Sequence, residues 1–453
     1  MVDPITRDII RNSLEYIAEE MGIVLRNSAY SSNIKERMDH SCAIFDPECR
    51  MLAHAEHIPV HLGAMPFAVR EAVRFFDELS EGDMILVNDP FLSGTHLPDL
   101  TLIAPVFEGE ELVGYVANRA HHSDIGGKTP GSMPGDSIEI FEEGLIIPPV
   151  KIVKRGNIDR EILRIVMANV RTPQVRKGDI LAQIAANLRG IERLRVLVNK
   201  YGIKTYMEAA EEILNYTERL ARSEISEMPK GASEAEDFLD DGGIWEKPIR
   251  IHVKVTIQRD EIMFNFEETD NQVKAPVNAP RTVTLSATYF VFKCIIDPTI
   301  PSNEGTYRPV KVITRKGSLI DAQKPYAVAG GNVETSQRIV DVLFKALSKL
   351  IPDRIPAASQ GTMNNVAFGG INPKTGRQFT FYETIGGGFG ARPNKDGVDG
   401  VHSHMTNTMN TPIEEIERLY PVRILRYSLR VDSGGAGKWR GGLGIERVYE
   451  ILA

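Results

Sequence analysis

The sequence predicts a mixed α/β fold of the α+β type, with prominent antiparallel sheet, a helical layer and several intertwined segments. Apolar residues recur at spacings of three and four over long stretches, which is typical of amphipathic helices. Shorter apolar and alternating stretches, bounded by turn residues, predict strands on both sides of the longest helical region. No glycine-rich loop lies between a strand and a helix as a Rossmann or P-loop unit requires.

The first expected element is a helix that starts at Pro4, because Asp3 is a suitable N-cap and proline is favoured at the first helical position. Two strands, 41–45 and 50–55, and a helix over 65–76 are expected next. The apolar positions of the first helix share one face: Ile10, Leu14, Ile17, Met21 and Val24.

A polar loop at residues 88–99 leads into a predicted β-hairpin formed by residues 100–107 and 112–118. Antiparallel pairing of the two arms brings Asp99 close to residues 118–121. The polar loop and the polar residues that follow the second arm therefore meet at the open end of the hairpin.

The remaining pattern predicts three segments with soft boundaries: an α/β region with the polar clusters (1–155), a helical segment (156–235) and an α/β region with glycine-rich loops (236–453). Because the chain stops directly after a predicted strand, we expect its C-terminus to be truncated. The later elements, in chain order, are helices over 158–170, 178–201 and 205–227, strands over 249–257 and 263–266, helices over 283–296 and 334–350, and a strand over 445–452.

Composition excludes several classes of partner. The formal net charge of -8, with no basic cluster, argues against nucleic acid and against an anionic membrane surface. No run of 18 uncharged apolar residues occurs, so no membrane span is expected. Three cysteines without a CxxC motif, and an N-terminus that enters a helix without a signal segment, favour a cytoplasmic protein.

Histidines gather in one part of the chain: seven of the ten lie between His40 and His122. Aspartates accompany them, and His96 and Asp99 are three residues apart around a proline that limits the loop entropy lost on ligation. Imidazole and carboxylate ligands without thiolates suit Zn, Mn or Fe(II). The pattern therefore predicts a divalent-metal site; a purely hydrogen-bonded polar cluster is the alternative.

Two further polar patterns have alternative explanations. His54, His57 and His61 are general acids or bases lining the same pocket, or simply buried and surface histidines; the intervening proline argues against a zinc-type HExxH helix. Asp179, Gln183 and Asn187 recur every four residues and predict either a pocket wall or a solvated helix face.

Residues 330–336 open a helix after two glycines, so they form either an anion site or a turn that starts the helix. They lack the lysine of a P-loop. If ATP is used, another chain is expected to supply it.

The chain resembles the hydantoinase B/oxoprolinase family over essentially its whole length. The motifs that carry this resemblance, in the family order, are Glu36-Arg37-Met38-Asp39-His40-Ser41, His57-Ile58-Pro59-Val60-His61-Leu62-Gly63, Asn88-Asp89-Pro90, Gly94-Thr95-His96-Leu97-Pro98-Asp99, His121-His122-Ser123-Asp124-Ile125-Gly126-Gly127, Gly178-Asp179-Ile180-Leu181-Ala182-Gln183, Gly331-Asn332-Val333-Glu334-Thr335-Ser336 and Asp432-Ser433-Gly434-Gly435-Ala436-Gly437-Lys438-Trp439-Arg440-Gly441-Gly442.

The resemblance implies the B subunit of an ATP-dependent amidohydrolase that opens a cyclic amide such as a hydantoin, 5-oxoproline or a lactam. It implies a hetero-oligomer with a hydantoinase A-type ATPase subunit, which phosphorylates the substrate oxygen. The implied metal ligands are His96, Asp99 and His121, with Asp39 as a fourth. His122, Asp124 and His57 are then the candidates for proton transfer.

Two alternatives stay open at this point. The family also includes the alpha subunits of ATP-dependent acetone and acetophenone carboxylases, and the shared motifs do not separate the two reactions. A chain with a structural metal that only supports the ATPase subunit is the non-catalytic alternative, which a closed ligand shell would favour.

Overall fold

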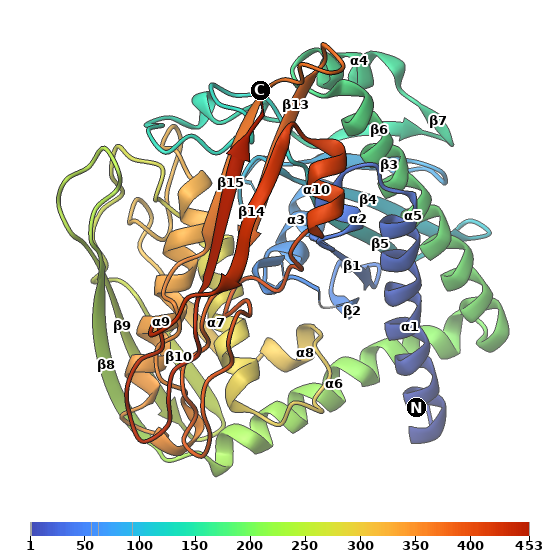
Figure 1. Ribbon diagram of the computed structural model, residues 1–453. Helices are drawn as coiled ribbons and strands as arrows, with labels where there is room; N and C mark the ends of the chain where they lie inside the picture. Colours follow the sequence, from blue (N-terminus) through green and yellow to red (C-terminus); the bar gives the residue numbers. More distant parts are fainter. Residues whose placement is uncertain (1, 56, 62, 93, 453) are drawn as a thin grey trace.

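The computed structural model describes residues 2–55, 57–61, 63–92 and 94–452 and confirms a mixed α/β fold (Figure 1). Ser93 of the polar loop and Leu62 of the second motif lie outside the described residues. The α-helices are α1 (Pro4–Ser28), α2 (Ser32–Lys35), α3 (Ala64–Val73), α4 (Arg160–Ala168), α5 (Pro173–Tyr201), α6 (Ile203–Glu227), α7 (Arg281–Ile295), α8 (Glu304–Tyr307), α9 (Ser336–Leu347) and α10 (Ile413–Leu419).

A seven-stranded sheet in the order β2-β1-β5-β4-β3-β6-β7 forms the centre of the molecule, with all neighbours antiparallel. The predicted hairpin supplies β4 and β5, and Asp99 pairs directly with His121 across it. Its strands are β1 (His40–Phe45), β2 (Met51–Ala55), β3 (Met84–Val87), β4 (Asp99–Glu108), β5 (Glu111–His121), β6 (Val150–Lys154) and β7 (Asn157–Ile158).

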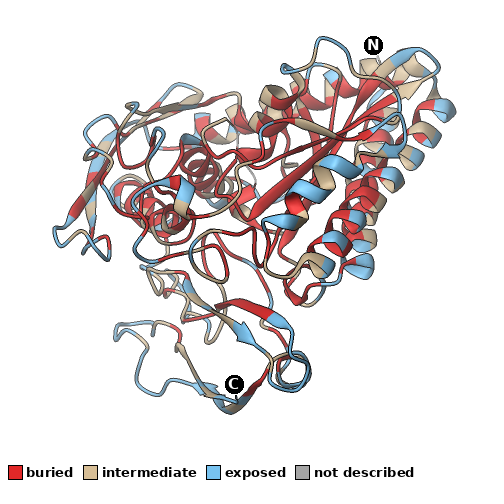
Figure 2. Ribbon diagram, turned by 90° about the horizontal axis from the view of Figure 1, so that it is seen from above, coloured by how far each residue is buried: buried red, intermediate tan, exposed pale blue. Residues whose placement is uncertain are grey.

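Both faces of this sheet are covered, and its strands β1 to β5 are buried throughout their central parts (Figure 2). Successive side chains point to opposite faces. Leu102 of β4 and Val116 of β5 belong to a core shared with α1, α5 and α6, whereas Ile103 and Ala117 belong to a second core shared with α7 and α9. The second core joins residues from Ala43 to Met405.

The helix α1 begins as predicted. The carboxylate of Asp3 accepts hydrogen bonds from the backbone amides of Ile5 and Thr6, which satisfies two donors that the first turn leaves free. The predicted apolar positions Leu14 and Met21 are fully buried against the sheet and against α5.

The polar face of α5 is buried rather than solvated. The Gln183 amide donates to the carbonyl of Leu100 and to the side chain of Asn118, and the Asn187 amide donates to the carbonyl of Leu102. The amides therefore fasten α5 to the hairpin that carries the polar clusters.

The second sheet and two hairpins complete the fold. Strand β8 lies within and beyond the end of the segment expected to be helical, and the β12–β13 hairpin was not expected from the sequence. The strands are β8 (Gly231–Leu239), β9 (Ile249–Gln258), β10 (Glu261–Asn265) and β11 (Val310–Ile313) in one sheet, and the hairpins pair β12 (Asn364–Ile371) with β13 (Gln378–Ile385) and β14 (Val422–Leu429) with β15 (Ile445–Ile451).

Among the described residues, no helix is long and apolar enough to cross a membrane. The β14–β15 hairpin, near the C-terminal end of the described chain, lies against the rest of the molecule as a largely exposed layer (Figures 1 and 2).

Candidate metal centre

The side chains of His96, Asp99 and His121 converge at the open end of the β4–β5 hairpin. Asp99 begins β4 and His121 ends β5, and their cross-strand pairing sets the two side chains side by side. The Asp99 Oδ1 atom lies 3.2 Å from His96 Nε2 and 3.3 Å from His121 Nδ1, and the two nitrogens are 3.1 Å apart. All three residues are buried.

This triangle fits one divalent cation. An ion bonded to nitrogen and oxygen at about 2.0–2.2 Å requires ligand atoms roughly 3.0–3.5 Å from one another. Hydrogen bonds alone do not satisfy these atoms. His96 Nε2 faces one oxygen and two nitrogens but can carry at most one proton. A cation inside the triangle would satisfy Nε2, Nδ1 and Oδ1 together.

The electrostatic surroundings favour a charged carboxylate at Asp99. Burial on its own raises the pKa of this group, but His96 and hydrogen bonds from His121 and His61 hold the pKa well below its usual value. Burial lowers the pKa of His121, which favours the neutral imidazole that binds metals.

Asp39 lies beside the triangle. Its backbone carbonyl accepts a hydrogen bond from the amide of His121, and its carboxylate is 3.9 Å from the Arg37 guanidinium. Burial raises the pKa of Asp39, and the charges of His121 and Arg37 oppose this rise. The group of three atoms that lie within ligand distance does not include Asp39, so its role as a fourth ligand stays a prediction.

Two neighbours support the triangle from other parts of the chain. His61 Nε2 lies 3.6 Å from Asp99 Oδ2, while its Nδ1 is 2.9 Å from the Ser41 hydroxyl. The Tyr382 ring stacks on the His121 ring, with centroids 4.6 Å apart. The histidine-rich motif signalled His61, whereas nothing in the sequence pattern singled out Tyr382.

The three residues expected to transfer protons lie apart from the triangle. His122 Nε2 contacts Gln183 on α5, and burial lowers the pKa of His122 to about 4. The Asp124 carboxylate is held by Arg171 through the guanidinium and the backbone amide. The His57 ring packs on the His40 ring with centroids 4.8 Å apart. Their roles in proton transfer stay predictions.

A cavity of about 640 Å³ lies near the centre, and Tyr382 forms part of its wall. The same residue stacks on His121, so Tyr382 stands between this cavity and the triangle, whose three residues do not line the cavity. Its polar lining comes from three separated regions of the chain: Asp240 and Asp241, Glu334 and Arg338, and Thr362 and Asn365.

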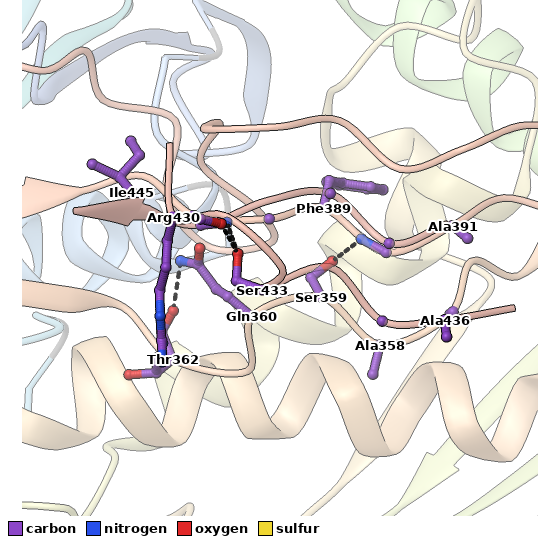
Figure 3. A pocket seen from close by; sticks show the side chains of 18 of the residues that line it. Ala358, Ser359, Gln360, Thr362, Phe389, Ala391, Arg430, Ser433, Ala436 and Ile445 are labelled. Carbon is purple, nitrogen blue, oxygen red and sulfur yellow. Dashed lines mark hydrogen bonds between the residues drawn. The ribbon is translucent and has the colours of Figure 1, made fainter. Parts of the chain in front are cut away.

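The glycine-rich loops line a second cavity of about 470 Å³, which shares Thr362 with the first (Figure 3). The Ser359 hydroxyl accepts a hydrogen bond from the amide of Gly390, and the Gln360 side chain donates one to the carbonyl of Thr362 (Figure 3). A Cβ atom on Gly388 would lie 2.0 Å from the carbonyl oxygen of Gly442, so glycine is required where these loops cross.

Glu143 binds the segment that directly precedes residues 330–336. We expect its ionisation to make the stability of the protein depend on pH. Its buried carboxylate accepts hydrogen bonds from the amides of Val328 and Ala329, and burial raises its pKa to about 7 from 4.5. A carboxyl group whose pKa is higher in the folded than in the unfolded protein stabilises the fold at a pH below its unfolded-state pKa. This stabilisation is lost as the pH rises toward and through the folded-state pKa.

We therefore expect the wild-type protein to lose on the order of 3 kcal/mol between pH 4.5 and 7 relative to Glu143→Gln, at about 1.4 kcal/mol per pKa unit. Urea unfolding of both proteins across this range checks the difference. Parallel pH profiles would contradict it.

Comparisons with known proteins show the family to which the chain belongs. The family model described as hydantoinase B/oxoprolinase matches residues 3–453. An uncharacterised protein of Methanocaldococcus jannaschii is 50% identical over the whole chain and 79% of its own length. The 5-oxoprolinase 1 of Arabidopsis thaliana is 40% identical over the whole chain, which spans 36% of that protein. The putative B subunit of a D-/L-hydantoinase from a Pseudomonas species is 35% identical over the whole chain and 78% of its own length.

Two solved structures share the fold. The ATP-dependent caprolactamase from Pseudomonas jessenii superposes with a TM-score of 0.91 at 32% identity, covering 98% of this chain and 78% of that one. An acetone carboxylase superposes with a TM-score of 0.92 at 20% identity, covering 99% of this chain and 62% of that one. At this identity the acetone carboxylase shows the fold alone. By its sequence and its structure, the chain belongs to the hydantoinase B/oxoprolinase family.

Proposed function

We propose that this chain is the metal-bearing catalytic subunit of an ATP-dependent hydrolase that opens a cyclic amide. The observation that carries the proposal is the buried triangle of His96, Asp99 and His121, whose neighbour Tyr382 lines a cavity. Two imidazoles and one carboxylate leave coordination positions for substrate or water, as in catalytic rather than structural sites. The names of the 5-oxoprolinase, hydantoinase and caprolactamase relatives support the substrate class.

For an amide, phosphorylation by one chain and hydrolysis by the other is a chemically reasonable sequence. The amide carbonyl is a poor electrophile, and phosphorylation of its oxygen activates the carbon and creates a leaving group. The sequence has no P-loop, so we propose that ATP is bound by a hydantoinase A-type subunit. The name of one relative, the putative B subunit of a hydantoinase, supports an assembly of more than one chain. The name of the ATP-dependent caprolactamase supports the use of ATP.

A divalent cation, when bound, would supply Lewis acidity and a lower pKa for water. The chain's own residues hold the geometry: Thr95 donates a hydrogen bond to Asp99 Oδ2, which turns Oδ1 toward the two histidines. Ser41 contacts His61 Nδ1 and so fixes the ring whose Nε2 faces Asp99. Oriented ligands of this kind lose little entropy on binding.

The three proposed proton-transfer residues differ in whether they line a cavity. His57 lines a third cavity of about 340 Å³, together with His402 and His404. His122 and Asp124 are enclosed by Gln183 and Arg171. We therefore propose His57 as the first of the three to test, with His57→Gln expected to lower turnover without changing the metal content.

Reconstitution with the ATPase subunit tests the proposed function. We expect the two chains to co-purify and to hydrolyse a hydantoin, 5-oxoproline or a lactam only when ATP and a divalent metal are present. ATP-dependent fixation of bicarbonate onto a ketone, without amide hydrolysis, would replace the hydrolase with a carboxylase. Failure to associate with any such subunit would contradict the two-subunit mechanism.

A further inference from the structure

The side chain of Asn332 lies beside the metal centre, although it is 236 residues away from His96 in the sequence. It belongs to a π-helical turn, Gly331–Thr335, directly before α9. Its Nδ2 atom lies 3.2 Å from His96 Nε2, and the residue is 4% exposed. Its Oδ1 atom is buried and has no hydrogen-bond partner among the described residues.

This orientation of the amide conflicts with a bound cation. The lone pair of His96 Nε2 cannot both bind a metal and accept a hydrogen bond from Asn332. The cation would also repel the positive end of the N–H dipole, while the carbonyl oxygen would stay buried without a partner, which is unfavourable. Rotating the amide by about 180° exchanges its oxygen and nitrogen, which have nearly equal size, and removes both conflicts.

We propose that Asn332 supplies its Oδ1 atom as a ligand to the cation held by His96, Asp99 and His121; the inference rests on the proposed metal centre. After the rotation Oδ1 occupies the place now taken by Nδ2, 3.2 Å from His96 Nε2. That separation equals the spacing between the three other ligand atoms. An added carbonyl oxygen moves the site toward ions that accept oxygen ligands readily, such as Mn²⁺.

The local backbone explains how the side chain arrives there. A Cβ atom on Gly331 would lie 1.8 Å from the carbonyl oxygen of Asn278, so only glycine lets the turn pack this closely on the preceding segment. The wide π-helical turn then changes the direction in which residue 332 points relative to α9, and such turns recur at functional sites.

Metal titration of the full-length protein tests the inference without any assay of turnover. Asn332→Leu removes the oxygen and keeps the branched shape of the side chain, whereas Asn332→Asp keeps an oxygen but, when ionised, cannot donate a hydrogen bond. We expect the Leu variant to bind Mn²⁺ at least about 10–100-fold more weakly by calorimetry, the range seen when groups around a metal are lost. We expect the Asp variant to bind within a few-fold of wild type or more tightly.

The visible absorption of bound Co²⁺ gives a second readout, because it reports the coordination number. We expect a changed spectrum for the Leu variant and an unchanged one for Glu334→Gln, the control, whose carboxylate accepts from Thr362 instead of facing the triangle. Asn332→Ala takes the place of the Leu variant if the latter does not fold.

Three outcomes would overturn the inference. One is wild-type Mn²⁺ affinity with an unchanged Co²⁺ spectrum in the Leu variant. Another is an equal loss of Mn²⁺ affinity in the Leu and Asp variants, which would show that Asn332 acts as an N–H donor. Either result leaves the proposed function standing as long as the wild type binds one ion, whereas the third, no binding by the wild type, would remove both.

Discussion

Replacing His121 by alanine is expected to abolish metal binding and amide hydrolysis together. The substitution removes one corner of the ligand triangle and leaves only His96 and Asp99 of the three ligands. Loss of groups that merely orient ligands costs 10–100-fold in metal affinity, so loss of a ligand should cost at least about 100-fold. Turnover of the reconstituted enzyme should fall below about 1% of wild type.

Mass-spectrometric metal analysis and ATP-dependent hydrolysis, measured on the same preparations, check this result. His252→Ala is a matched control, because His252 is a buried histidine on β9 in the second sheet, outside the ligand group. It should keep its metal and its activity. Turnover retained by a metal-free His121→Ala enzyme would show that the cation is not catalytic.

Replacing Arg447 by methionine is expected to produce the largest loss of stability. Arg447 forms an ion pair with Glu383, and both side chains are fully shielded from solvent. Glu383 also accepts a hydrogen bond from the amide of Thr411. Removing one partner leaves a buried charge without compensation, which costs about 3–5 kcal/mol.

The loss should be concentrated in the layer that Arg447 holds. Hydrogen exchange should speed up in β14 and β15, where Arg447 lies, before it changes in β4 and β5. The double variant Glu383→Gln/Arg447→Met should regain much of the stability, because glutamine is neutral and still accepts from Thr411. A double variant less stable than the single one would contradict the ion-pair explanation.

Local sequence patterns predicted the part of the metal centre that the β4–β5 hairpin forms. The turn at residues 108–110 fixes the register of β4 and β5, and that register places Asp99 opposite His121. His96 is three residues from Asp99 and shares its loop, so its place followed from the same reasoning. The N-cap at Asp3 and the apolar stripe of α1 were equally local, and the structure confirms both.

Other parts depend on contacts that no local pattern contains. Asn332 approaches His96 from a position 236 residues away, and Tyr382 approaches His121 from the β12–β13 hairpin. Strand β8 begins with glycine and is rich in glutamate and alanine, residues depleted in strands, so its pairing with β9 overrides its propensity. Long-range packing decided these elements.

A crystal grown with Mn²⁺ or Zn²⁺ tests the central claim most directly, through the anomalous scattering of the metal. The metal centre predicts one strong peak about 2.0–2.3 Å from His96 Nε2, His121 Nδ1 and Asp99 Oδ1, with Asn332 Oδ1 turned toward it. Under the same conditions, a triangle without a peak, or a peak elsewhere in the molecule, would contradict it.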